Sequence, residues 1–244
     1  MSEYDPTEYG ARIAAEYDDI YDEVFDTEPA VARLVELAAG GGVLELGVGT
    51  GRLALPLAER GVPVHGVDAS QAMLDRLAAK PGGAGLPVTV GDFAEVCVPG
   101  RFSLVVLAIN TIFALPTQDA QVRCFQNAAR HLSAGGRFLV EAWVPDPSQF
   151  VQGQSVRPRA VGGDRVALVV ARHDPVEQRM TTTQVHLSDA GVRLYPANHR
   201  YAWPAELDLM ARLAGFGLEH RWGDWQGGPF TDQSTSHVSV YRLG

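Results

Sequence analysis

The 244-residue sequence contains no cluster of basic residues, and this absence limits the partners that the chain can bind. Lys and Arg together number 20 against 29 Asp and Glu, so the formal net charge at pH 7 is −9. A nucleic-acid surface needs Lys and Arg grouped on one face to neutralise phosphates. We therefore expect no nucleic-acid partner.

Cysteine is rare, and long apolar runs are missing. Cys97 and Cys124 lie in apolar or helical stretches without metal-ligand spacing, and there is no 18-residue apolar run and no positively charged signal segment. These absences predict a reduced, cytoplasmic protein with no metal site and no contact with a membrane. The 46% hydrophobic content excludes a disordered chain and is sufficient for one large α/β domain.

The most informative segment passes from a short apolar run into three alternating glycines. It reads VLELGVGTGR over residues 43–52, with Glu45 inside the run and Gly47, Gly49 and Gly51 in the turn. Glycine tolerates positive φ and lets a ligand lie against the backbone, and the N–H groups of the following helix attract an anionic group. A dinucleotide site has the wider G-x-G-x-x-G spacing. The pattern therefore favours a different charged cofactor, with a purely structural turn as the alternative.

The next two strands each end at an acid. Asp68 can accept hydrogen bonds from both hydroxyls of a ribose, or it can cap the following helix. Met73 in that helix either packs on an adenine ring or belongs to the core. Asp92 and Phe93 suit the adenine amino group and ring, although an Asp turn explains the acid as well.

The rest of the chain continues this alternation and then changes its period. The near-continuous apolar run 102–110, in which the small Ala108 leaves room for a ring, is typical of a central parallel strand. A helix follows at 120–132, then a loop at 133–136 and a fifth strand at 137–143. From Arg165 onward a period of two indicates antiparallel strands at 166–173, 180–187, 192–195 and 199–203. A helix over 204–214 and a hairpin of 218–225 with 236–243 close the sheet.

Residues 30–145 resemble the class I S-adenosylmethionine (SAM)-dependent methyltransferases. The glycine motif, Asp68, Gly91-Asp92, the strand end at Asn110 and the segment 132–136 occur in that family's order and intervals. Residues 9–17, 140–145 and Phe150 further resemble small bacterial enzymes that N-methylate nucleotide-linked amino sugars, whereas segments between 203 and 228 resemble bacterial class I methyltransferases of varied substrates.

The resemblance implies an α/β fold: a Rossmann-like class I methyltransferase sheet with helices on both faces and an inserted antiparallel β layer. We predict an N-terminal lid helix (1–30), a SAM-binding core (31–145), the inserted substrate-side layer (146–203) and a C-terminal helix with closing strands (204–244). The implied cofactor is S-adenosyl-L-methionine, the implied reaction is methyl transfer to oxygen or nitrogen of a small-molecule acceptor, and no oligomeric state is predicted.

These expectations define a candidate site. We expect the cofactor to contact Tyr17, Glu45, Gly47, Gly49, Gly51, Asp68, Ala69, Met73, Asp92, Phe93 and Ala108. We expect the acceptor to contact Tyr9, Asn110, Trp143, Arg200 and Tyr201. In the amino-sugar enzymes a tyrosine pair at this spacing forms a lid, which places Tyr9 toward the substrate and Tyr17 toward the cofactor; a helix that only packs on the sheet is the alternative.

The proton acceptor is harder to assign. A sulfonium is already an activated electrophile, so no covalent intermediate is needed, and the sequence has no G-x-S-x-G nucleophile motif. The amino-sugar enzymes have a histidine after the fourth strand, and alignment puts Ala114 at that position, which favours an oxygen or an undecided acceptor over nitrogen. Glu141, His186 and Tyr9 are the candidate bases.

Aromatic and polar residues near the predicted strand ends favour a small polar natural product or a sugar-like acceptor held between aromatic walls. They are Trp143, His173, His186, Arg200, Tyr201 and Trp203. A SAM-binding protein without catalysis remains an alternative. A nicotinamide-dependent oxidoreductase is less favoured, because the sequence has neither the wider glycine spacing nor a Tyr-x-x-x-Lys motif after Tyr17 or Tyr21.

Overall fold

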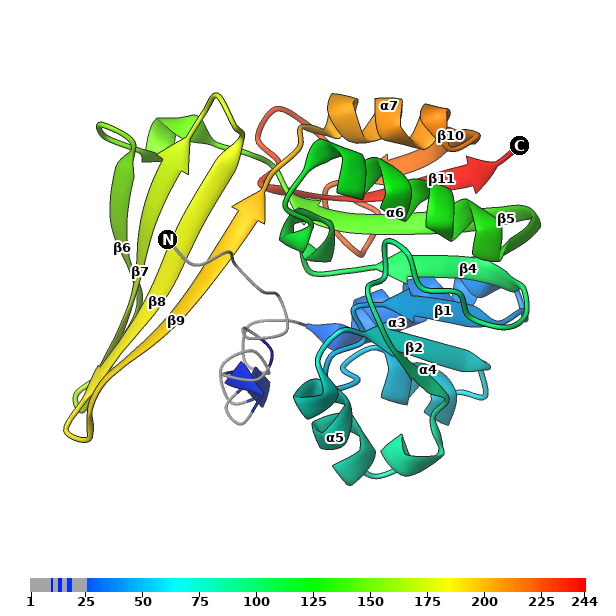
Figure 1. Cartoon of the computed structure of the whole chain (residues 1–244), viewed down its shortest axis with the longest axis horizontal. Coiled ribbons are helices and arrows are strands. Elements are labelled where there is room, and N and C mark those ends of the chain that lie inside the picture. Colours follow the sequence, from blue (N-terminus) through cyan, green and yellow to red (C-terminus); the bar gives the residue numbers. More distant parts are fainter. Residues whose placement is uncertain (1–9, 11–12, 15–16, 19–25) are drawn as a thin grey trace.

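The computed structural model describes Gly10, Ile13, Ala14, Tyr17, Asp18 and residues 26–244 (Figure 1). Most of the predicted lid helix, including Tyr9, therefore lies outside the described residues. The predicted division at residue 30 falls within α3. Among the described residues, no helix combines the length and the apolarity that crossing a bilayer would require.

The core alternates strands and helices. Its elements are α3 (Thr27–Ala38), β1 (Val43–Leu46), α4 (Ala54–Glu59), β2 (Val64–Asp68), α5 (Gln71–Ala79), η1 (Gly83–Gly85), β3 (Val88–Val90), β4 (Phe102–Leu107), η2 (Thr111–Ala114), α6 (Gln118–His131), β5 (Leu132–Trp143), α7 (Pro204–Leu213), β10 (Phe216–Trp222) and β11 (Ser236–Leu243). The seven strands form one sheet in the order β10-β11-β5-β4-β1-β2-β3. Strands β1 to β5 pair in parallel, and β11 runs antiparallel between β5 and β10.

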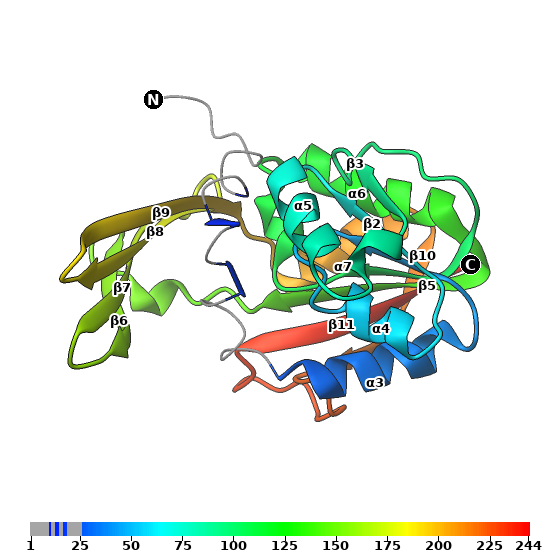
Figure 2. The same cartoon turned by 90° about the horizontal axis from the view of Figure 1, so that it is seen from below.

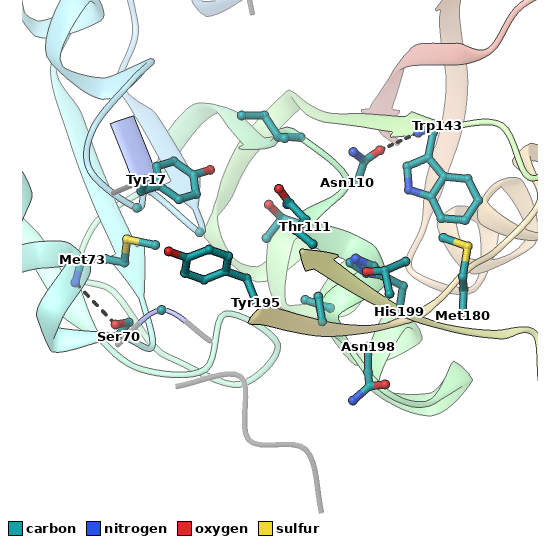
Figure 3. Close-up of a pocket in the computed structure, with 18 of the residues that line it drawn as sticks. Tyr17, Ser70, Met73, Asn110, Thr111, Trp143, Met180, Tyr195, Asn198 and His199 are labelled. Carbon is teal, nitrogen blue, oxygen red and sulfur yellow. Dashed lines mark hydrogen bonds between the residues drawn. The ribbon is translucent and has the colours of Figure 1, made fainter. Parts of the chain in front are cut away.

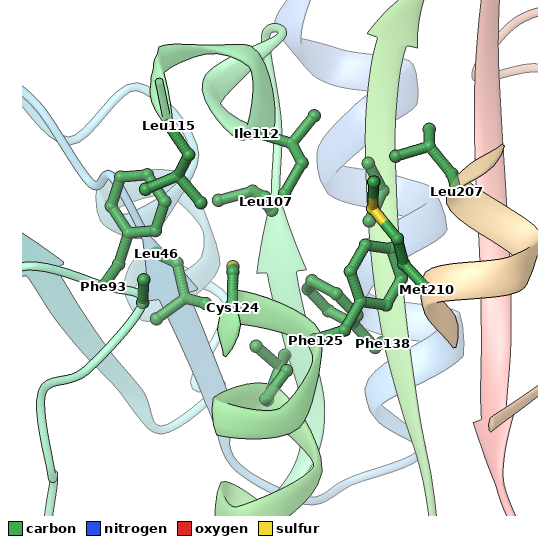
Figure 4. Packing of buried hydrophobic residues seen from close by; sticks show 14 of the residues in the cluster. Leu46, Phe93, Leu107, Ile112, Leu115, Cys124, Phe125, Phe138, Leu207 and Met210 are labelled. Carbon is green, nitrogen blue, oxygen red and sulfur yellow. The ribbon is translucent and has the colours of Figure 1, made fainter. Parts of the chain in front are cut away.

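Helices bury both faces of this sheet, as the apolar strands require. One face packs against α6 and α7 through a cluster that includes Phe125, Phe138 and Met210 (Figure 4). The other face packs against α3, α4 and α5 through Leu34, Leu57 and other aliphatic residues. The predicted Rossmann-like sheet with helices on both faces is confirmed. The carboxyl ends of β1, β2 and β4 therefore meet at one edge, where a ligand can bind.

A second sheet of four antiparallel strands stands apart from the core in Figure 1. It consists of β6 (Gln154–Val161), β7 (Arg165–Asp174), β8 (Arg179–Ser188) and β9 (Gly191–Arg200), preceded by η3 (Pro147–Gln149). The described N-terminal residues lie between this sheet and the core (Figure 2). The inserted antiparallel layer is thus confirmed, with strands longer than the sequence predicts.

Proline explains two of the differences. No strand is predicted between residues 144 and 165, and the last predicted strands of the layer leave out residues 196–198. A proline, which cannot donate a ladder hydrogen bond, lies in each of these gaps. Both β6, which contains Pro158, and β9 are edge strands, where the missing N–H faces outward. The predicted division of β9 is therefore wrong.

The fourth strand is shorter than predicted. It ends at Leu107 rather than Asn110, because Ile109 and Asn110 adopt positive φ values of 49° and 61° and turn the chain into η2. The predicted loop 133–136 instead belongs to β5, which begins at Leu132.

Candidate active site

A cavity of about 740 Å³ lies between the carboxyl ends of the core strands and one face of the antiparallel sheet. Figure 3 shows Tyr17, Ser70 and Met73 at one end and Trp143, Met180 and His199 at the other. Nine predicted site residues line it: Tyr17, Gly47, Gly49, Asp68, Ala69, Met73, Phe93, Asn110 and Trp143. The structure therefore brings together most of the predicted cofactor end.

The glycine turn forms the floor of this end. Gly47, Gly49 and Gly51 have φ values of +74°, +54° and +87°, which L side chains rarely adopt. A Cβ on Gly47 would lie 2.6 Å from Thr111 Cγ2, whereas a Cβ on Gly49 would meet nothing within 4 Å. Gly49 therefore borders open cavity that a cofactor can fill. Gly51 lies outside the cavity lining and packs closely on Leu55 and Leu77.

Asp68 connects this turn to the start of α5. Its Oδ2 accepts a hydrogen bond from the Gly49 N–H at 2.9 Å, and its Oδ1 accepts one from the Ser70 N–H at 2.9 Å. Burial raises the pKa of Asp68, and the N–H groups of Ser70, Gly49 and Ala69 oppose the rise. Ser70, not Asp68, caps α5, since its Oγ accepts from the Met73 N–H. Asp68 also lines the cavity wall.

Three other predicted cofactor residues do not line the cavity. Asp92 is exposed and accepts from the Ala94 N–H at 2.8 Å, which is the Asp turn named as the alternative. Ala108 is buried in the core. Glu45 is 5% exposed; burial raises its pKa to about 8, opposed by the charge of Arg52 and augmented by that of Asp68.

Glu141 stabilises the turn after β4. Its Oε2 accepts from the Ile109 N–H at 2.9 Å, and its Oε1 accepts from the Trp225 indole N–H at 2.7 Å. The Asn110 Oδ1 in turn accepts from the Trp143 N–H at 2.6 Å. Both Glu141 oxygens are thus engaged and Glu141 does not line the cavity, while Asn110 remains in its lining.

One face of the antiparallel sheet supplies the opposite wall. Side chains alternate along a strand, so residues that pair across strands share a face. One cross-strand row contains Val169, Gln184 and Tyr195, and another contains His173, Met180 and His199. His186 shares this face but pairs with Ala167 and Arg193, farther along the sheet and outside the cavity lining.

His199 is a titratable residue of this wall that the site prediction omits. Its Nδ1 is buried without a hydrogen-bond partner, and burial lowers its pKa to about 4. In the sequence it is one histidine among three on predicted strands, so only the register of β9 distinguishes it. Other lining residues missing from the prediction include Ser70, Thr111, Met180, Gln184 and Tyr195.

Arg200 points to the other side of β9. It is 7% exposed, and its guanidinium donates to Gln121 Oε1 at 2.7 Å, Gln178 Oε1 at 3.2 Å and Glu206 Oε1 at 2.7 Å. Gln121 also donates to the Arg200 carbonyl at 2.7 Å. Arg200 thus joins the inserted sheet to α6 and α7 and does not line the cavity. Tyr201, also absent from this lining, hydrogen bonds through its hydroxyl to His173 Nε2 at 2.9 Å.

The described N-terminal residues join the two walls. Ile13 and Ala14 pack with Met73 of α5 and Tyr195 of β9. Asp18 accepts from the Thr50 hydroxyl at 2.6 Å and forms an ion pair with Lys80 at 2.9 Å. Tyr17 lines the cavity on its cofactor side.

Comparison with known proteins agrees with this geometry. A methyltransferase domain model matches residues 43–136. The chain is 32% identical over 203 residues, 81% of each protein, to the cypemycin N-terminal methyltransferase of a Streptomyces species. The CcbJ methyltransferase of Streptomyces caelestis superposes with a TM-score of 0.91 at 41% identity, covering 99% of this chain and all of that one.

The chain therefore belongs to the class I SAM-dependent methyltransferases, and S-adenosyl-L-methionine is its cofactor. SAM-bound CalS10 of Micromonospora echinaspora, an amino pentose methyltransferase, shares the fold with a TM-score of 0.68 at 18% identity, covering 100% of this chain and 99% of that one. The open space beside Gly49 and the Asp68 carboxylate fit such a cofactor.

Proposed function

We propose that the protein methylates a nitrogen of a small natural-product acceptor, and that His199 orients that nitrogen. The carrying observation is the place of His199 in the wall opposite the cofactor turn, with a buried Nδ1 that has no hydrogen-bond partner. When bound, SAM supplies an electrophilic methyl group. The chain then has to exclude water and hold the acceptor lone pair in line.

His199 can replace the histidine that the amino-sugar enzymes have after the fourth strand and that this chain lacks at Ala114. The Ala114 position belongs to η2, which packs against β9, and both Ala114 and His199 line the cavity. The small Ala114 side chain leaves space at this wall, and β9 presents an imidazole to it. A proton-accepting group can thus come from another element, which removes the reason for favouring oxygen over nitrogen.

The electrostatics of the wall also favour an amine. A histidine with a pKa of about 4 is uncharged near neutrality, so it can accept a hydrogen bond from an N–H group but is a weak base for a hydroxyl. Arg157 and Arg159 lie at the edge of the same cavity. Their positive charges disfavour an ammonium ion and favour the free amine, which is the nucleophile. After transfer, the product ammonium releases its proton to water.

The cypemycin relative supports the same class, because its name specifies an N-terminal methyltransferase. Asp68 and the glycine turn would hold the cofactor nucleoside, and Trp143, Met180 and Tyr195 would surround the acceptor.

The test is a cofactor-turnover assay with a panel of amino sugars, small primary and secondary amines, and hydroxyl analogues of the same skeletons. We expect turnover with amines and none with the matched hydroxyl compounds. His199→Ala should lower kcat/KM for the amine about 3- to 10-fold, the loss expected for one hydrogen bond between uncharged groups, with unchanged SAM affinity.

His199→Gln should recover part of the rate, because its amide can still accept a hydrogen bond. His186→Gln is the matched control, since His186 lies on the same sheet face outside the cavity. Turnover confined to hydroxyl compounds would refute the nitrogen acceptor. An unchanged kcat/KM in His199→Ala would refute the assigned role of that residue.

A further inference from the structure

A second cavity, of about 550 Å³, lies beside the first. It is bounded by the segment after β5, by the 232–235 loop and by the inner ends of β6, β7 and β8. Trp143, Arg157 and Met180 line both cavities. The two spaces therefore adjoin along these three residues.

The cross-strand register gives the spacing between them. His173 of β7, Met180 of β8 and His199 of β9 form one row across the sheet. His173 lines the second cavity, His199 lines the first, and Met180 lies between them. Neighbouring strands are about 4.8 Å apart, so the two histidines are separated by roughly 10 Å.

The second cavity is walled by aromatic rings. Phe150 and His173 have centroids 4.7 Å apart, His173 and Tyr201 5.6 Å, and Trp143 and Tyr201 5.9 Å. Trp203 packs edge-on against Tyr201 yet is 42% exposed, which is high for so large an aromatic side chain. These faces suit a flat, uncharged ring.

Several polar groups at this cavity are already engaged. His173 and Tyr201 bond to each other, Arg157 donates to Gln149, and Asp146 accepts from Ser148 and Gln149. A ring that stacks on the aromatic faces would keep these contacts.

We infer that the second cavity binds a ring of the methyl acceptor about 10 Å from the nitrogen that is methylated. The preferred acceptor is thus a two-part molecule, with an amine end in the first cavity and a ring end in the second. The inference rests on the proposed function only for the amine end; the ring site stands on its own geometry.

The experiment measures binding to the protein saturated with S-adenosylhomocysteine. Calorimetry compares 6-phenylhexylamine, in which six methylene groups separate the ring from the nitrogen, with hexylamine, which has no ring, and with benzylamine, whose ring is too close to the nitrogen. Primary alkylamines are mostly ammonium ions near neutrality, and because hexylamine and 6-phenylhexylamine lose that proton at the same cost, the ratio of their affinities reports the ring alone. We expect 6-phenylhexylamine to bind about tenfold more tightly than either, as for a ring gaining aromatic contacts.

Phe150→Ala and Trp203→Ala should each lower the ratio of the affinities for 6-phenylhexylamine and hexylamine by at least about fivefold and leave the affinity for hexylamine unchanged. Leu194→Ala is the control, because Leu194 lies on the opposite face of β9 and is 58% exposed. Retained S-adenosylhomocysteine binding verifies the fold of each variant, and Phe150→Leu repeats the test with a smaller volume change.

Equal affinity for hexylamine and 6-phenylhexylamine would overturn the inference. So would a preference that survives in both alanine variants. Binding of 6-phenylhexylamine with the expected variant losses but without methyl transfer from SAM would support the ring site and count against the amine acceptor.

Discussion

Removal of the Asp68 carboxylate tests the cofactor end of the cavity directly. Asp68 lines the cavity and holds the Gly49 turn through a 2.9 Å hydrogen bond. If it also accepts both ribose hydroxyls, Asp68→Ala removes two charge-assisted hydrogen bonds, each worth about 1.5–3 kcal/mol. Their sum, about 3 kcal/mol at the low end, corresponds to a Kd for S-adenosylhomocysteine raised about 100-fold or more.

The assay is isothermal calorimetry with S-adenosylhomocysteine on both this variant and Asp92→Ala. Asp92 is exposed, lies outside the cavity and bonds only locally to the Ala94 N–H, so we expect its Kd to change less than tenfold. Urea unfolding of each variant separates loss of the ribose contact from collapse of the turn. A folded Asp68→Ala protein with wild-type affinity would refute the assignment.

Three further predictions concern buried charges and the N-terminal segment. Burial raises the pKa of Glu45 in the folded state to about 8, against 4.5 for the free side chain. Between these two pH values the folded chain binds this proton and the unfolded chain does not, so the free energy of unfolding of the wild type, relative to that of Glu45→Gln, should fall as pH rises from about 4.5 to about 8. Urea unfolding at several pH values checks this, and a constant difference would contradict it. Arg200→Met should cost about 3 kcal/mol in the free energy of unfolding, because Glu206 then loses its buried partner; a loss below about 1 kcal/mol would show that the network is not what joins the sheet to the core. Asp18→Asn should weaken SAM binding by removing the ion pair with Lys80, whereas its amide oxygen can still accept from the Thr50 hydroxyl. Deletion of residues 1–25 should weaken binding more and abolish transfer while the core stays folded. Asp26→Asn, at an N-cap that makes no side-chain bond, should have no effect, and full activity after the deletion would refute a lid.

The parts of the fold that the sequence predicts are those with strong local patterns. The strand β11 coincides with the predicted range 236–243, and β1 coincides with the apolar run that precedes the glycine turn. The strand β6 was not predicted, because a strand with Pro158 and mostly exposed residues has little apolar pattern. Only pairing with β7 identifies it.

The candidate site also has residues that the local sequence specifies and residues that only the tertiary structure specifies. Gly47, Gly49 and Asp68 were predicted because the glycine spacing and the strand end specify them locally. His199 and Arg200 are adjacent, and composition cannot tell which of them faces the cavity. The register of β9 decides this, and tertiary contacts far along the chain set that register.

The hydrogen bonds of Arg200 bear on how amino-acid substitutions can change the acceptor specificity of such an enzyme. By fixing the carboxyl end of β9 to α6 and α7, it keeps positions 195, 197 and 199 toward the cavity whatever residues they carry. A one-residue slip would exchange His199 for Arg200, and the network resists that slip. Substitutions at alternate positions of one edge strand can therefore alter acceptor choice while the cofactor turn, encoded more than a hundred residues earlier, stays unchanged.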